Sequence, residues 1–134
     1  MPIIRGYKQL MAEAREKIRT LTLAEAEALL DAPNVVFVDI RDVRELEREG
    51  IIPGAFHAPR GMLEFWVDPE SPYYKDIFGS GKEFVLYCQS AWRSSLATAA
   101  LQDMGLTNVC HIEGGFGAWK EAGLPIGEKP QHKR

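Results

Sequence analysis

The chain has 134 residues, enough for one domain that buries a proper core, and its composition argues against disorder and collagen-like repeats. Its net charge of −3 gives no electrostatic reason to bind nucleic acid or an anionic membrane. No apolar run is long enough to span a membrane, and the first residues lack the apolar core of a secretion signal, so we expect a cytoplasmic protein.

The first third of the chain alternates helical and strand patterns. Apolar residues on one face predict a helix at residues 7–19, within an N-terminal extension (residues 1–19). We expect this helix to pack on the domain; docking of a partner is the alternative. Thr22 and Glu25 form a capping-box pattern at the start of a second helix. Residues 35–38 are apolar without alternation, typical of a parallel strand buried on both faces. Shorter patterns predict a strand at residues 20–22 and a charged helix at 43–49.

The middle of the chain is richer in turn signals. Residues 51–54 contain a Pro-Gly pair typical of a turn, and a short strand is expected at 55–58. The aromatic-rich stretch 67–81 predicts a folded loop with a helical turn near residues 73–77, and we favour core cover over a role at the rim of a site. His57 has no second ligand at a suitable spacing, so we interpret it as a packed or edge histidine and not as a metal ligand. We expect no metal and no cofactor.

The last third holds a strand, a cysteine and a helix in direct succession. Residues 84–87 predict a buried strand, and apolar residues recur at helical spacing from Ser94 onward. Cys88 is therefore expected on a strand-to-helix turn at the carboxyl end of a strand, where open α/β sheets place ligands. Further patterns predict a strand at 108–112, a helix at 116–121 and a polar, frayed tail at 127–134.

The predicted position of Cys88 favours a reactive thiol. Backbone N–H groups in such a turn can face inward as an anion-binding nest, and a helix N-terminus adds roughly half a positive charge. Both favour the thiolate, which is the nucleophilic form of cysteine. Arg93 adds a fixed cation at the end of the loop. A buried, inert cysteine is the competing interpretation; we favour the reactive one because Arg93 and the helix start coincide.

Four further sequence blocks follow one another along the chain: VDIR at 38–41 followed by Glu45-Leu46, GIIPGA at 50–55, CQSAWR at 88–93 and EGGFGAW at 113–119. In their order and spacing they resemble the motifs of single-domain rhodaneses, which are sulfurtransferases. The resemblance runs from about residue 20 to residue 126, which we take as the domain. It implies an α/β, rhodanese-like fold: a parallel five-stranded sheet flanked by helices, here with an extra N-terminal helix.

The resemblance also implies a double displacement on Cys88. The cysteine would take a sulfane sulfur from a small donor such as thiosulfate, hold it as a persulfide, and pass it to cyanide, a cellular thiol or a sulfur-accepting protein. Arg93 would hold the loop and attract the anionic donor. The pocket wall, mainly through its backbone, would be Gln89, Ser90, Ala91 and Trp92. The residues bracing the loops beneath the site would be Asp39, Arg41 and Glu45.

Two departures from the family pattern concern the loop. Ala91 stands where the family often has glycine, which restricts the loop if that position needs a positive φ. Gln89 and Trp92 leave Arg93 as the only cation of the loop, so thiosulfate should be favoured less and a bulkier or more apolar sulfur donor more.

Three other functions compete with sulfur transfer. In a cysteine-dependent phosphatase the loop between cysteine and arginine must enclose a phosphate. The loop from Cys88 to Arg93 is one residue too short for that. A non-catalytic binding module is disfavoured because both residues are retained. A redox protein would pair Cys88 with Cys110, but Cys110 is expected to be an inert core residue. We assign no role to His111.

Overall fold

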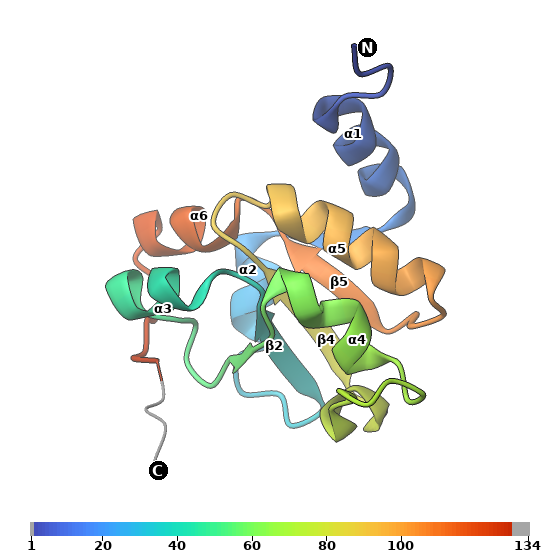
Figure 1. Ribbon diagram of the computed structural model, residues 1–134. Helices are drawn as coiled ribbons and strands as arrows, with labels where there is room; N and C mark the ends of the chain where they lie inside the picture. The colour runs from blue at the N-terminus through green and yellow to red at the C-terminus, as the bar shows by residue number, and fades with distance from the viewer. Residues whose placement is uncertain (1, 130–134) are drawn as a thin grey trace.

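The computed structural model describes residues 2–129, which form an α/β fold built on a parallel five-stranded sheet (Figure 1). The strands are β1 (Arg19–Leu21), β2 (Val35–Asp39), β3 (Phe56–His57), β4 (Glu83–Tyr87) and β5 (Val109–Ile112). Their order across the sheet is β1-β5-β4-β2-β3, so β4 lies at the centre. The predicted fold class is confirmed.

Helices connect the strands, and two of them begin at capping boxes visible in the sequence. The helices are α1 (Tyr7–Lys17), α2 (Leu23–Ala28), α3 (Val43–Glu49), α4 (Leu63–Val67), α5 (Trp92–Asp103) and α6 (Gly115–Glu121), with short 3-10 turns η1 (Arg60–Met62) and η2 (Asp76–Gly79). Thr22 and Glu25 cap α2 as predicted, and Asp42 and Glu45 form the same motif at α3.

The central strand divides the core into two halves. Phe84 and Leu86 of β4 pack with residues of α4 and α5 on one face of the sheet, and Val85 and Tyr87 pack with residues of α2 and α6 on the other. Successive side chains of a strand point to opposite faces, so a strand covered on both sides must be apolar throughout. This explains the continuous apolar run in β4.

The N-terminal helix packs along α5 rather than on the sheet (Figure 1). Ala14 and Ile18 form a small apolar cluster with Ala99 of α5. The Arg15 Nε group donates a hydrogen bond to Ser95 Oγ at 3.2 Å. The predicted extra helix is thus present, and it contacts the helix that follows the candidate cysteine.

Two predicted elements differ in position from the structure. The helix at α5 begins at Trp92 rather than Ser94, because the carbonyl of Ala91 already accepts the Ser95 N–H at 3.1 Å. The helical turn expected at residues 73–77 was misplaced: η2 begins at Asp76, and its Phe78 covers the core.

The structure bears on only part of the predicted C-terminal tail. Gly127, expected in a frayed tail, pairs with Ile51 through two backbone hydrogen bonds of 2.8 and 3.0 Å. Residues 130–134 of that tail lie outside the described residues, and the domain boundaries at residues 20 and 126 stay predictions.

Within residues 2–129, no helix has the length and apolarity needed to cross a membrane.

Candidate active site

Cys88 lies directly after β4, at the carboxyl edge of the sheet, as predicted. Its side chain is fully buried, and its Sγ accepts a hydrogen bond from the backbone N–H of Ser94 at 3.3 Å. Ser94 is in the first turn of α5, where backbone N–H groups have no partner inside the helix. The sulfur therefore takes up one of the free donors at the positive end of this helix. A wider ring of amides around the sulfur stays a prediction.

Ala91 gives the loop its shape by adopting a left-handed backbone conformation. Its φ is 72°, and it is the only residue other than glycine with a positive φ among residues 2–129. That conformation costs a residue with a side chain roughly 1–2 kcal/mol. The Ala91 carbonyl accepts hydrogen bonds from the Ser95 hydroxyl at 2.5 Å and from the Ser95 N–H at 3.1 Å. These two hydrogen bonds hold the strained backbone of Ala91 in place. The predicted restriction at Ala91 is thus present.

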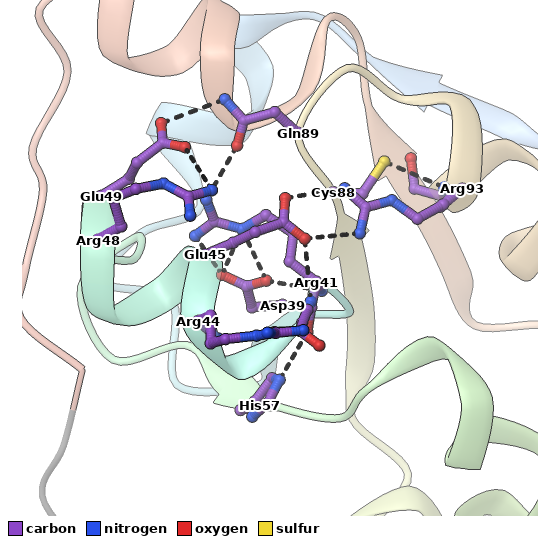
Figure 2. A network of polar contacts seen from close by, with 12 residues as sticks. Asp39, Arg41, Arg44, Glu45, Arg48, Glu49, His57, Cys88, Gln89 and Arg93 are labelled. Atoms are coloured by element: carbon purple, nitrogen blue, oxygen red, sulfur yellow. Dashed lines mark hydrogen bonds and ion pairs between the residues drawn. The ribbon is translucent and has the colours of Figure 1, made fainter.

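Arg93 forms a bidentate ion pair with Glu45 of α3 (Figure 2). The distances are 2.8 Å from Nη1 to Oε1 and 3.0 Å from Nη2 to Oε2. The hydrogen bonds from Arg93 lower the pKa of the Glu45 carboxyl, and those from Glu45 raise the pKa of Arg93. This contact ties the loop to α3, and the roles expected of both residues at a site stay predictions. It also means that the charge of the loop's only arginine is shared with a carboxylate.

Arg41 lies fully buried beneath the loop and connects it to its supports (Figure 2). Its Nη2 donates to Asp39 Oδ2 at 2.8 Å and to the Gly50 carbonyl at 2.7 Å, and its Nη1 donates to Gln89 Oε1 at 3.0 Å. Burial alone would lower the pKa of Arg41, but the hydrogen bonds and charge of Asp39 raise it overall. Asp39 and Arg41 thus contact each other and the loop, and their role in bracing a site stays a prediction.

Gln89 enters this network through its side chain, whereas the sequence suggested a role mainly for its backbone. Besides accepting from Arg41, it donates from Nε2 to Glu49 Oε1 at 3.3 Å. Ser90, next in the loop, is exposed. The second loop position is thus held by α3 and by the buried arginine, and its side chain is not free to contact a substrate.

Trp92 is half exposed and stacks on Tyr7 of α1, with ring centroids 5.1 Å apart and an angle of 29° between the rings. The predicted N-terminal extension therefore contributes an aromatic side chain next to the loop. Sequence reasoning missed this contact because nothing in the pattern of residues 7–19 distinguishes Tyr7 from the other residues of the helix.

A second missed residue is His111 of β5, which is fully buried. Its Nδ1 lies 2.9 Å from Ser94 Oγ, and its Nε2 lies 2.9 Å from Thr20 Oγ1 of β1. Burial, with a smaller contribution from the charge of Arg15, lowers the pKa of His111 to about 4. The ring is thus neutral near neutral pH and sits behind the residue whose N–H contacts the sulfur.

Cys110 is a free thiol on the other face of the sheet from Cys88. The two cysteines belong to the two separate halves of the core. Burial raises the pKa of Cys110 to about 11, as expected for an inert core residue. Their placement argues against a redox function that pairs Cys88 with Cys110. Within residues 2–129 no three His, Cys, Asp or Glu side chains are grouped so that they could hold a metal ion.

Fold and site together define an α/β protein with a buried cysteine on a strand-to-helix loop, held by two arginine–carboxylate pairs. The family model of the rhodanese-like domain matches residues 22–122. The chain therefore belongs to the rhodanese-like domain family.

Several similar proteins are sulfur transferases by description. A sulfurtransferase of Allochromatium vinosum is 35% identical over 101 residues, which make up 75% of this chain and 86% of that protein. A polysulfide-sulfur transferase homodimer of Wolinella succinogenes has 29% identity and a TM-score of 0.68, over 96% of this chain and 91% of that one.

Other similar proteins carry different descriptions. A structure from Rhodopseudomonas palustris, described as a protein of unknown function and possible tyrosine phosphatase, has 58% identity and a TM-score of 0.91 over 94% of this chain and 97% of that one. The chain spans 59% of the length of an uncharacterised Synechocystis relative and 31% of the tRNA uridine(34) hydroxylase of Erwinia tasmaniensis.

Proposed function

We propose that this protein is a cytoplasmic sulfurtransferase that carries a sulfane sulfur as a persulfide on Cys88. The observation that supports this most directly is the Ser94 N–H on the Cys88 sulfur, at the N-terminal end of α5. A donor fixed there stabilises negative charge on sulfur in the thiolate and in the persulfide alike. The sulfurtransferases among the relatives support the same reaction class.

The reaction consists of two displacements on sulfur. In the first, the Cys88 thiolate attacks the outer sulfur of the donor; the donor's S–S bond breaks, and its electron pair leaves with sulfite from thiosulfate, or with a thiolate from an alkyl persulfide. In the second, a thiolate or cyanide attacks the outer sulfur of the Cys88 persulfide. That S–S bond breaks and the Cys88 thiolate is regenerated, so no external oxidant or reductant is required.

The charge and shape around the loop favour alkyl persulfides over thiosulfate as donors. Arg93, the loop's only cation, already shares its charge with Glu45, so little positive charge is left for a dianion. Cys88 is buried, so only a narrow group can reach its sulfur without moving side chains. A persulfide offers its outer sulfur on a slender arm, and its alkyl part can rest on the exposed ring of Trp92.

The proposed function is tested by following transfer to cyanide, which yields thiocyanate. Thiosulfate and an alkyl persulfide are compared as donors, with Cys88→Ser as the inactive variant and Cys110→Ser as the matched control. We expect turnover in the wild type and in Cys110→Ser, a higher kcat/KM for the persulfide, and no turnover in a folded Cys88→Ser. Turnover that survives in Cys88→Ser would contradict the proposal.

The geometry of the same loop argues against a phosphatase. Both terminal nitrogens of Arg93 are bonded to Glu45, so the guanidinium is not directed at a phosphate above the sulfur. Negligible phosphate release from an aryl phosphate is the expected result. A binding module without catalysis predicts that neither donor adds sulfur to Cys88.

A further inference from the structure

Ser94 contacts Cys88 through its backbone and His111 through its side chain. Its backbone N–H donates to Cys88 Sγ at 3.3 Å, and its hydroxyl lies 2.9 Å from Nδ1 of His111. Both residues are fully buried. The position of the N–H that contacts the nucleophile is therefore set partly by a histidine on a different strand.

His111 is in turn fixed from its other side. Its Nε2 lies 2.9 Å from Thr20 Oγ1, and the two residues are direct partners in the register of β1 and β5. With both ring nitrogens paired, rotating the imidazole would leave two buried polar groups unsatisfied, which is costly inside a protein. The ring thus forms a rigid link from the edge of the sheet to the first turn of α5.

The chemistry of the link does not depend on which tautomer is present. The ring is neutral near neutral pH, since burial lowers the pKa of His111 to about 4, and it then carries one donor and one acceptor nitrogen. The hydroxyls of Ser94 and Thr20 can each donate or accept. Arg15, on α1, is the charged group that disfavours protonation of the ring.

We propose that His111 is a positioning residue for sulfur transfer, acting through Ser94 to hold its N–H on the Cys88 sulfur. The inference rests on the proposed function. It assigns a role to a histidine that never touches the substrate, and it predicts that the half of the ring facing Ser94 matters more than the half facing Thr20.

Two substitutions separate the halves of the ring. His111→Asn places an amide atom where Nδ1 was and can keep the Ser94 contact; His111→Gln places one where Nε2 was and can keep the Thr20 contact. We expect kcat/KM with an alkyl persulfide to stay within about twofold in His111→Asn. In His111→Gln, kcat/KM should fall about tenfold, as for a weakened hydrogen bond to a charged group. On the acid side of the pH profile, kcat/KM should also decline at a higher pH than in the wild type.

The controls distinguish positioning from a loss of folding. Cys110→Ala removes a neighbouring buried side chain on the opposite face, so it should lower the Tm without changing kcat/KM. Ser94→Ala should match His111→Gln, and the double variant should be no slower than either alone, because both remove one link. His111→Gln at the wild-type rate, or His111→Asn as slow as His111→Gln, would overturn the inference. Absence of turnover in the wild type would overturn the proposed function instead, and the inference with it.

Discussion

Arg93 donates from both terminal nitrogens to the carboxylate of Glu45, across 2.8 and 3.0 Å, so the last residue of the cysteine loop is bound to α3. This geometry holds the loop in place, and it also lowers the positive charge that the loop offers to an anion. The same contact thus affects structure and donor choice.

Glu45→Gln should improve the use of thiosulfate. The amide can keep the capping contact with the Asp42 N–H, which lies 3.1 Å from Glu45 Oε1, while the charge of Arg93 is released. We expect the KM for thiosulfate, a dianion, to fall several-fold and the KM for an alkyl persulfide, whose reacting group carries at most one negative charge, to change less. The free energy of unfolding should fall by no more than about 1 kcal/mol, because the pair is partly exposed. A higher KM for thiosulfate would show that Glu45 serves the donor in some other way.

Ala91 provides a test of backbone strain in the loop. Ala91→Gly relieves a left-handed alanine but loses a buried methyl group and gains unfolded-state entropy, so the free energy of unfolding should stay within about 1 kcal/mol of the wild type. Ala91→Val puts a branched side chain at φ 72° and should cost about 2 kcal/mol or more, with most of the activity lost. Denaturant unfolding and kcat/KM check both. An unaffected valine variant would mean that this conformation is not required.

The buried pair of Asp39 and Arg41 should be far more sensitive than an exposed pair. Both side chains are fully buried, so Asp39→Asn leaves the Arg41 charge uncompensated and should cost about 3–5 kcal/mol of unfolding free energy. Asp103→Asn, which breaks the exposed pair with Lys17, is the control and should cost less than about 1 kcal/mol. Similar losses in the two variants would contradict the bracing role.

Protonation of His111 should make the fold less stable in mild acid. Burial lowers the pKa of His111 to about 4 from about 6.5 in the unfolded chain, so the unfolded state binds more protons between these values. The neutral buried ring of His111 therefore contributes its full stabilisation above about pH 6.5. As the pH falls toward 4, the free energy of unfolding loses about 3 kcal/mol in all. Unfolding free energies of wild type and His111→Asn, compared from about pH 7.5 to about pH 5, should converge by about 2 kcal/mol. Parallel curves would show that His111 is not buried in its neutral form.

Local patterns were sufficient to predict most of the individual helices and strands, whereas the parallel five-stranded sheet was implied by the family resemblance. The apolar run at β2 and the Thr22–Glu25 capping box predicted elements that the structure contains, because both depend on neighbours within a few residues. The strand-to-helix position of Cys88 followed from the same kind of pattern. The start of α5 was missed because the sign of φ at Ala91 is imposed by the closed loop and not by alanine itself.

The contacts that complete the site depend on tertiary structure. His111 meets Ser94 only because β5 lies between β1 and β4 and beneath α5. Tyr7 meets Trp92 only because α1 folds back along α5. Neither partner is near the other in the sequence, and a single sequence carries no periodic signal for such pairs.

The central claim is that Cys88 carries the transferred sulfur, and the intact mass of the protein tests it most directly. After incubation with an alkyl persulfide or thiosulfate and removal of the donor, the wild type and Cys110→Ser should each gain the mass of one sulfur atom. That gain should disappear on adding cyanide and be absent from Cys88→Ser. An unchanged mass in the wild type, or a sulfur that remains in Cys88→Ser, would contradict the account.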